Sequence, residues 1–147
     1  MSGPRHEYRI STDVSRFDID AIHAFLSREA YWSLGIPRDV VARALANSVA
    51  AGAFSGEHQV GLARVVTDKA TFAWLCDVFV LEAHRGRGVA QRMLSALREH
   101  PDLQGLRRWV LATRDAHELY KRCGFVQLAN PERWMAINDP EVYARRG

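Results

Sequence analysis

The first third of the chain predicts a short strand followed by two helices. Residues 18–29 carry apolar side chains three and four positions apart, after Asp18, a residue type that commonly caps a helix. Residues 35–48 repeat that spacing, with Pro37 where the first helical residue is expected. A short strand-like run at residues 7–10 precedes both helices.

The middle third predicts three strands and a third helix. Residues 49–68 read as two strands joined by a turn at "SGE", and residues 71–81 are nearly all apolar, as in a strand buried on both faces. A helical spacing starts at Val89 and ends before Pro101. Its expected inward residues are Val89, Ala90, Met93, Leu94 and Leu97.

The last third predicts a strand, a helix and a closing hairpin. Residues 107–113 read as a strand, and residues 114–125 as a short helix with Gly124 at its end. The apolar runs at 125–128 and 133–137 are expected to pair with each other. The resulting order, β-α-α-β-β-β-α-β-α-β-β, is typical of an α/β or α+β fold.

Length and charge narrow the class of protein. The chain has 147 residues, which predicts one domain, 1–147. Its net charge is +3, and only Lys69 and Lys121 are lysines among 20 basic residues. Arginine suits bidentate contacts with oxyanions. The charge is too small for a dedicated nucleic-acid binder.

Neither a metal site nor a membrane segment is expected. Cys76 and Cys123 lack the spacing of a zinc site or a disulfide framework. The N-terminus has no apolar signal region, and no run approaches the ~20 apolar residues of a membrane span. We therefore expect a cytoplasmic protein.

The stretch "HRGRGVAQRML", residues 84–94, lies where a predicted strand leads into a predicted helix. Free N–H groups at a helix N-terminus favour anions, and glycine lets an oxyanion approach the backbone. The P-loop pattern is excluded because its lysine and hydroxyl residue are missing, and the GxGxxG dinucleotide pattern because Gln91 replaces its third glycine. The loop is still suited to a pyrophosphate.

Two motifs together identify a family resemblance. Arg85 to Ala90 fit the pattern R-x-x-G-x-A, and Ala116 to Phe125 fit A-x-x-L-Y-x-x-x-G-F about 30 residues later. In this order and separation they resemble the signatures of the GNAT superfamily of N-acyltransferases. The resemblance implies a mixed, mostly antiparallel central sheet with helices on both faces.

The resemblance also implies a cofactor, acetyl-CoA, and the residues that bind it. Val78, Phe79 and Val80 match the strand whose backbone pairs with the pantetheine arm. Thr113 stands where the family often has an asparagine that contacts the pantetheine. The pyrophosphate loop would comprise Arg85, Gly86, Arg87, Gly88, Val89 and Ala90.

Tyr120 matches the position that often protonates the leaving CoA thiolate in this family. Packing of its ring in the core is the alternative. Asp77 is the leading general base, because it interrupts an apolar strand beside the expected reaction centre; pairing with an arginine such as Arg64 is the alternative. His84 and His117 are weaker candidates. Direct transfer in a ternary complex is favoured over an acyl-enzyme on Cys76.

The acceptor is expected to be a small-molecule or peptide primary amine. Tyr31 and Trp32, in the connection between the first two helices, are candidate acceptor contacts, although both rings could instead pack the helices against the sheet. A homodimer through the C-terminal segment is compatible with the fold. Two alternatives to an N-acetyltransferase remain, a CoA-binding sensor without catalysis and a nucleic-acid-binding module that uses the arginines.

Overall fold

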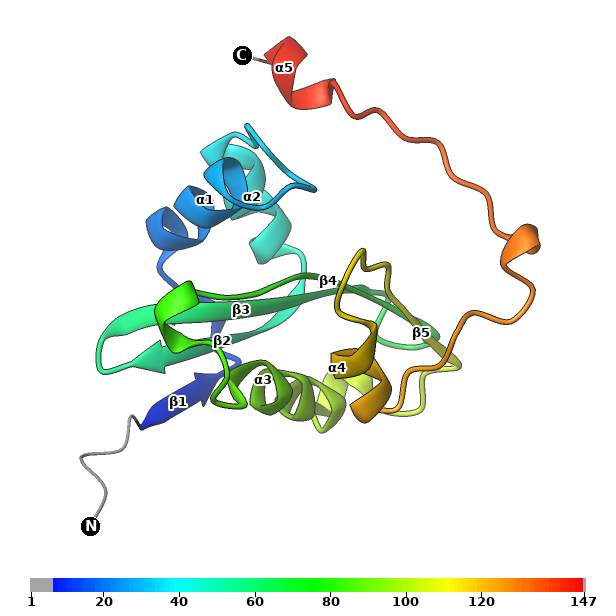
Figure 1. Ribbon diagram of the computed structural model, residues 1–147, viewed down its shortest axis with the longest axis horizontal. Coiled ribbons are helices and arrows are strands. Elements are labelled where there is room, and N and C mark those ends of the chain that lie inside the picture. Colours follow the sequence, from blue (N-terminus) through cyan, green and yellow to red (C-terminus); the bar gives the residue numbers. More distant parts are fainter. Residues whose placement is uncertain (1–6, 147) are drawn as a thin grey trace.

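A five-stranded sheet with helices on both faces forms the body of the protein (Figure 1). The structure is a computed structural model and describes residues 7–146. The elements in chain order are β1 (Tyr8–Ser11), η1 (Val14–Arg16), α1 (Ile19–Arg28), α2 (Arg38–Ala46), β2 (Val49–Ser55), β3 (His58–Thr67), β4 (Phe72–Val80), η2 (Glu82–His84), α3 (Val89–Arg98), η3 (Pro101–Leu103), β5 (Arg108–Val110), α4 (His117–Arg122), η4 (Pro131–Arg133) and α5 (Val142–Arg146).

The strands lie in the order β1-β2-β3-β4-β5, with every neighbouring pair antiparallel except β4 and β5. Antiparallel neighbours need only short turns, and Gly56, with a φ of 58°, lies in the turn between β2 and β3. The parallel step from β4 to β5 requires a crossover, which α3 provides. The mixed, mostly antiparallel sheet expected from the resemblance is confirmed.

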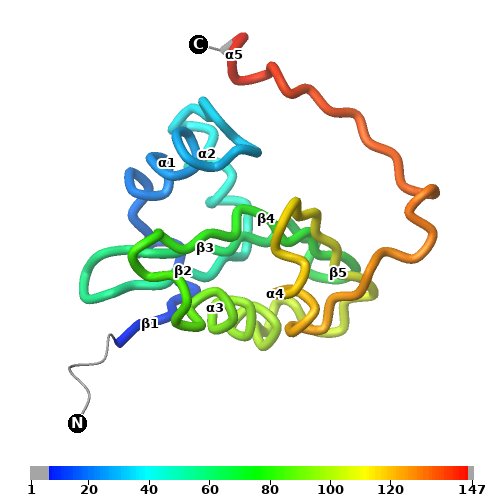
Figure 2. The backbone as a smooth tube through the Cα atoms, in the orientation of Figure 1, coloured from blue at the N-terminus to red at the C-terminus, as the bar shows by residue number. Residues whose placement is uncertain are grey.

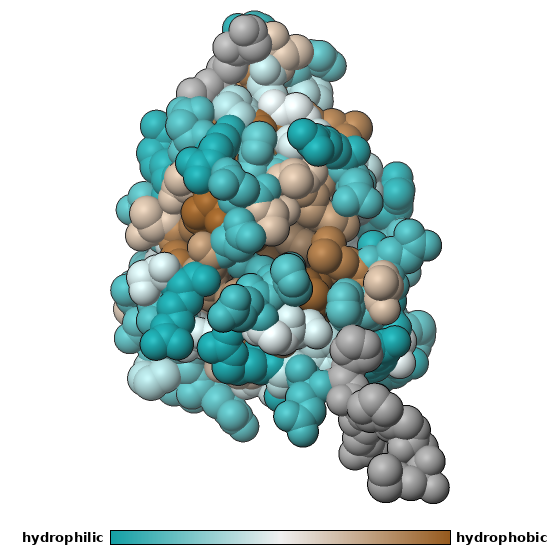
Figure 3. Space-filling view, turned by 90° about the vertical axis from the view of Figure 1, so that its left-hand side faces the viewer, coloured by the Kyte–Doolittle hydropathy of each residue, from teal (hydrophilic) through white to brown (hydrophobic). Residues whose placement is uncertain are grey.

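Two apolar clusters hold the helices on the two faces of the sheet. On one face, Ile22 and Leu26 of α1 and Leu45 of α2 pack with Leu62 and Phe79 of the sheet. The other cluster joins α3 and α4 to the opposite face; its members include Met93, Leu97, Tyr120, Val65 and Leu75. An end-on view shows apolar surface at mid-height between polar surfaces above and below (Figure 3).

The helix boundaries follow from local capping. The Asp18 side chain accepts a hydrogen bond from the Ala21 N–H at 3.0 Å, as the predicted N-cap of α1 should. Pro37 lies one position outside α2, as its N-cap, so the prediction of Pro37 as the first helical residue is wrong by one position. Gly124 follows α4 with a φ of 98°, the conformation expected at a glycine stop.

The predicted closing hairpin is absent from the described structure. Residues 125–128 and 133–137 form no strand, and the predicted strand at 107–113 shortens to β5, three residues long. A strand needs a partner edge, and an edge of three residues supports little pairing. After α4, the chain arches away from the body and reaches α5 beyond the α1–α2 face (Figure 2).

Within residues 7–146, no helix is both long and apolar enough to cross a membrane. The same residues contain no cluster of three or more His, Cys, Asp or Glu side chains that could hold a metal ion.

Candidate functional site

The glycine loop, residues 85–88, joins η2 to the N-terminus of α3. Gly86 and Gly88 have φ values of 77° and 76°, and Gly88 is the N-cap residue of α3. A Cβ added at either glycine would meet nothing within 4 Å, so the glycines serve a left-handed backbone rather than close packing. The first-turn N–H groups of α3 therefore begin at an exposed loop with open space around it.

Both arginines of the loop form hydrogen bonds with other parts of the chain, one with the end of β4 and one with β1. The Arg85 Nε donates to the Val80 carbonyl at 2.8 Å, at the end of β4. An Arg87 guanidinium nitrogen donates to the Tyr8 hydroxyl at 3.0 Å, and the same hydroxyl lies 2.9 Å from the His84 Nδ1. Both arginines remain exposed, so their charges flank the helix N-terminus while their side chains are held in place. His84 thus helps to position the Tyr8 hydroxyl that binds Arg87.

The second half of β4 has a free backbone edge toward β5. Pairing between these strands ends at Trp74 and Val110, whereas β4 continues to Val80. On its other edge β4 pairs with β3 on both sides of one irregularity, and the pairs at this end are Val80 with Gly61 and Phe79 with Leu62. Val78 and Val80 are half-buried, while the Phe79 ring is buried and stacks on Phe25 with 4.0 Å between centroids. Only Leu81 and η2 separate the end of this edge from the glycine loop.

Asp77 lies at a β-bulge in this strand, a feature that the sequence did not predict. The register shifts so that Ala63 of β3 faces both Asp77 and Val78, and Asp77 takes a φ of 52°. Aspartate tolerates this left-handed conformation better than most residues do. The bulge turns the Asp77 carboxylate away from the direction that regular strand alternation would give it.

The Asp77 carboxylate is bound on both oxygens. Arg64 Nε donates to Oδ2 at 2.8 Å and Trp32 Nε1 donates to Oδ1 at 2.8 Å. The Arg64 and Asp77 side chains are 17% and 11% exposed. Burial opposes the charged guanidinium of Arg64 and is the largest single effect on its pKa, but the attraction and hydrogen bond of Asp77, together with smaller effects of Cys76 and Tyr143, outweigh it and raise the Arg64 pKa. The pairing with Arg64 that the sequence offered as an alternative is what the structure shows.

Trp32 belongs to an exposed aromatic pair in the connection between α1 and α2. Tyr31 and Trp32 are each 44% exposed and meet edge to face, 5.1 Å between centroids. The Arg114 guanidinium, from the connection between β5 and α4, lies 3.8 Å from the Tyr31 ring centroid. The two connections therefore meet at this pair, and Arg114 is a site residue that the sequence analysis missed. The bulge at Asp77 lies beneath it.

Tyr120 lies in α4 and lines a cavity of about 750 Å³. Its side chain is 9% exposed, and burial first, with smaller effects of Cys123, Tyr31 and Asp115, raises its pKa to about 12. The hydroxyl therefore stays protonated near neutral pH. The ring packs against Phe125, so the core contact that was the alternative for Tyr120 is also present.

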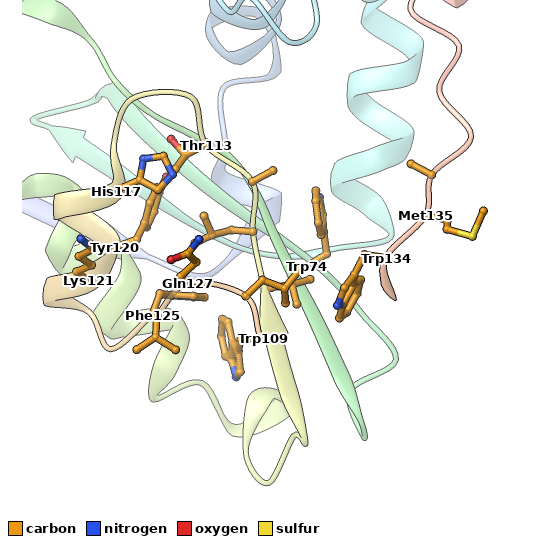
Figure 4. A pocket seen from close by; sticks show the side chains of 16 residues that line it. Trp74, Trp109, Thr113, His117, Tyr120, Lys121, Phe125, Gln127, Trp134 and Met135 are labelled. Carbon is orange, nitrogen blue, oxygen red and sulfur yellow. The ribbon is translucent and has the colours of Figure 1, made fainter. Parts of the chain in front are cut away.

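The cavity extends from Tyr120 along β5 toward the C-terminal segment (Figure 4). Thr113 and His117 lie near Tyr120, and Trp74 and Trp134 lie toward the other end (Figure 4). The Thr113 hydroxyl oxygen accepts a hydrogen bond from the Ala116 N–H at 3.1 Å, ahead of α4. The glycine loop contributes no residue to this lining. The predicted site residues therefore fall into three groups: the glycine loop with the end of β4, Asp77 with the aromatic pair, and Tyr120 with Thr113 in the cavity.

Cys76 precedes Asp77 in the sequence, but its thiol is not suited to act as a nucleophile. Burial raises the Cys76 pKa to about 12, which the nearby Arg64 only partly offsets and Asp77 reinforces. A thiol with that pKa is almost entirely protonated near neutral pH and is therefore a poor nucleophile.

Comparison with known proteins identifies the family. A model described as "Acetyltransferase (GNAT) domain" matches residues 41–127. A candidate acetyltransferase of Gibberella zeae is 37% identical, with 79% of this chain and 77% of that protein covered.

Solved structures agree. A GNAT-family candidate acetyltransferase from Xanthomonas campestris pv. campestris is 47% identical, with a TM-score of 0.90 over 94% of this chain and 97% of that one. A candidate acetyltransferase of Clostridium acetobutylicum, solved with acetyl-CoA, is 20% identical and shares the fold, with a TM-score of 0.65 over 90% of this chain and 95% of that one. The match to the family model, the curated relative and the shared fold together show that this chain belongs to the GNAT acetyltransferase family.

Proposed function

We propose that this protein is a single N-acetyltransferase domain that transfers the acetyl group of acetyl-CoA directly to a primary amine. The free edge of β4 that leads into the glycine loop carries this proposal. It is a stretch of backbone that β5 does not pair, and η2 and the glycine loop connect it to a helix N-terminus with two flanking arginines. An amide-containing arm with a pyrophosphate needs both features.

The residues on the page fit acetyl-CoA. Val78 to Val80 lie on the edge of β4 that β5 does not pair, where the Val80 carbonyl also accepts from Arg85, and a pantetheine arm would pair there as an added strand. The open space beside Gly86 and Gly88 leaves room for two phosphates against the N–H groups of Val89 and Ala90. Arg85 and Arg87 would supply the opposing charge, and the Thr113 hydroxyl one further polar contact.

When bound, acetyl-CoA supplies an activated acetyl thioester. Tyr120 is the proposed general acid, and it would hold a proton on Oη for the departing sulfur. Among the described residues this hydroxyl makes no hydrogen bond, so it is available to donate one. Its raised pKa keeps the proton in place but makes complete transfer to a thiolate less favourable than for an ordinary phenol. We therefore assign Tyr120 mainly the stabilisation of the developing thiolate.

For Asp77 we propose a positioning role in place of the general base expected from sequence. A base needs an oxygen free to take the proton of the amine, but Arg64 and Trp32 occupy both carboxylate oxygens. The same contacts tie the Trp32 ring to the bulge in β4. Asp77 would therefore fix the aromatic pair against which the acceptor amine binds.

The aromatic pair of Tyr31 and Trp32 is the proposed acceptor contact. Arg114 contacts the Tyr31 ring and Asp77 accepts a hydrogen bond from Trp32, yet both residues remain 44% exposed. Part of each ring surface is therefore available to contact an acceptor. Cys76 and Cys123 are both free thiols, which agrees with the reducing cytoplasm that we propose as the compartment.

Calorimetric titration with acetyl-CoA tests the proposal, with ATP, NADH and a short DNA duplex as controls. We expect saturable one-to-one binding of acetyl-CoA alone, followed by turnover in a screen of amines. Binding without turnover on any amine would favour the CoA-binding sensor. DNA binding with steep salt dependence and no response to acetyl-CoA would favour the nucleic-acid module and overturn the proposal. Against the module, the guanidinium groups of Arg98 and Arg108 already lie over the rings of Trp109 and Trp134, 5.0 and 5.1 Å from the ring centroids.

A further inference from the structure

Arg114 brings to the proposed acceptor contact a positive charge that no described residue neutralises. It is exposed and lies in the connection between β5 and α4. Within residues 7–146 it forms no ion pair and no hydrogen bond, although Asp115 follows it in the sequence. The Asp77 carboxylate beneath the aromatic pair is already paired with Arg64. The N–H donors of Arg114 are therefore available to a ligand.

The Tyr31 ring holds the Arg114 guanidinium at a defined place. The distance from the guanidinium carbon to the ring centroid is 3.8 Å, the shortest of the four arginine–ring contacts within the described residues; the other three are 5.0, 5.0 and 5.1 Å. A ring face offers no oxygen or nitrogen acceptor, so a cation that rests on it keeps its N–H groups for other partners. Most exposed arginines must lose rotamer freedom when they bind a ligand, whereas this contact has already restricted Arg114.

The connection that carries the aromatic pair is itself held in place. The Ser33 hydroxyl is 6% exposed and donates to the Leu26 carbonyl of α1 at 2.8 Å. Trp32 is fixed from below by its hydrogen bond to Asp77. In Figure 1 the connection after β5 rises toward the connection between α1 and α2, where Arg114 meets the pair. The two rings and the guanidinium thus form one pre-organised surface.

Tyr120 lies close enough to this surface to act on the same ligand. Burial is the main cause of its raised pKa, followed by Cys123, but Tyr31 and Asp115 also contribute, so these groups interact electrostatically with the Tyr120 hydroxyl. Thr113, the residue before Arg114, lines the cavity together with Tyr120. An acceptor on the aromatic pair would therefore be within reach of both Arg114 and the proposed reaction centre.

We infer that Arg114 binds an oxyanion carried by the acceptor, so that the acceptor is a primary amine that also bears a carboxylate or a phosphate. The inference rests on the proposed function, because it specifies the acceptor of that reaction. The planar guanidinium fork matches either oxyanion with two parallel hydrogen bonds. An amine without an oxyanion would bring an ammonium group toward the unneutralised Arg114 charge, and like charges repel. Arg114 would thus select the acceptor and take no part in the chemical step.

Matched pairs of amines test the inference. Phenylalanine is compared with phenethylamine, which lacks only the carboxylate, and O-phosphoethanolamine with ethanolamine, which lacks the phosphate. The best acceptor from the amine screen is compared in the same way with its analogue that lacks or gains an oxyanion. We expect kcat/KM to be about tenfold or more higher for the oxyanion-bearing member. The pair with the larger ratio distinguishes a carboxylate from a phosphate.

Arg114→Gln should remove this preference. The kcat/KM for the oxyanion-bearing amine should fall about 10- to 100-fold, while the value for its analogue and the KM for acetyl-CoA stay within about twofold. Arg114→Lys should retain part of the preference, because the charge remains and the fork is lost. Arg9→Gln is the matched control: Arg9 also rests on a ring, 5.0 Å from the Phe54 centroid, but on β1 at the opposite edge of the sheet. Equal losses for both members of a pair, or a raised KM for acetyl-CoA, would overturn the inference.

Equilibrium binding separates this inference from the proposed function. Saturation-transfer NMR follows the same four amines on the full chain, with and without CoA, for the wild type and Arg114→Gln. Arg114-dependent binding of an oxyanion-bearing amine by a protein that acetylates no amine would keep the anion site and remove the proposed function. Turnover of amines without any dependence on Arg114 would do the reverse. Absence of binding and turnover of every oxyanion-bearing amine tested would also refute the anion site.

Discussion

The glycine loop and the cavity beside the C-terminal arm, residues 126–141, are both open to solvent, but they expose different kinds of groups. In the loop the exposed groups are backbone N–H groups, fixed by two positive φ angles and the start of α3. In the cavity and the arm the exposed groups are side chains, with fractions as high as 102% at Ile137. An anion can use the loop as it stands, whereas the cavity is suited to an apolar group. Backbone conformation should decide function in the first region, and side-chain chemistry in the second.

The largest effect is expected in the cavity, from the loss of one oxygen atom. Tyr120→Phe removes the proton donor and keeps the packing against Phe125, so kcat should fall about 10²- to 10⁴-fold while acetyl-CoA binding stays within about twofold. Steady-state kinetics with an acceptor from the amine screen would measure it. Tyr143→Phe in α5 is the control. Equal kcat values for Tyr120→Phe and wild type would reduce Tyr120 to a packing residue.

In the loop, the conformation of a single residue should control binding. Gly88→Val places a β-branched residue at a φ of 76°, where the left-handed conformation costs about 1–2 kcal/mol, so acetyl-CoA binding should weaken about tenfold. Gly105→Val is a matched control, because Gly105 has a φ of 70° and equally open surroundings. Both variants should lose similar stability in denaturant titrations. Similar losses of acetyl-CoA affinity in both would mean that the glycine loop is not the binding site.

The same contrast explains what the sequence could predict. The two motifs located the glycine loop and Tyr120 because their chemistry is local, a few residues at fixed spacing. The bulge at Asp77 was missed because it depends on the register between β3 and β4, which no short pattern records. Arg114 was missed for a similar reason, since its partner Tyr31 is far away in sequence.

The error at the C-terminus has another physical origin. The spacing of "RWMAI" is compatible with a strand, but residues 133–137 form none, because a strand also needs a partner edge and spacing does not supply one. The predicted partner was the neighbouring run at residues 125–128. In the structure Phe125 packs against Trp109 and Tyr120, and Val126 already points to solvent, so the first strand of the hairpin never forms.

A smaller effect is expected where the acceptor loop meets β4. Trp32→Phe keeps an aromatic ring but removes the hydrogen bond to Asp77 Oδ1, and one such bond contributes about 0.5–1.5 kcal/mol. The KM for the acceptor should rise about two- to tenfold, with kcat and the KM for acetyl-CoA nearly unchanged. Trp134→Phe, at a tryptophan of similar exposure in the arm, should leave the acceptor KM unchanged. A fall in kcat without a change in KM would argue against positioning.

Asp77→Asn separates positioning from base catalysis at the same residue. The amide oxygen can still accept from Trp32, but the charge that pairs with Arg64 is lost. With a positioning role, the loss should appear in the acceptor KM and in stability, and the pH dependence of kcat should keep the shape of the wild-type profile. A base would behave differently, because its removal would abolish the acidic limb of that profile.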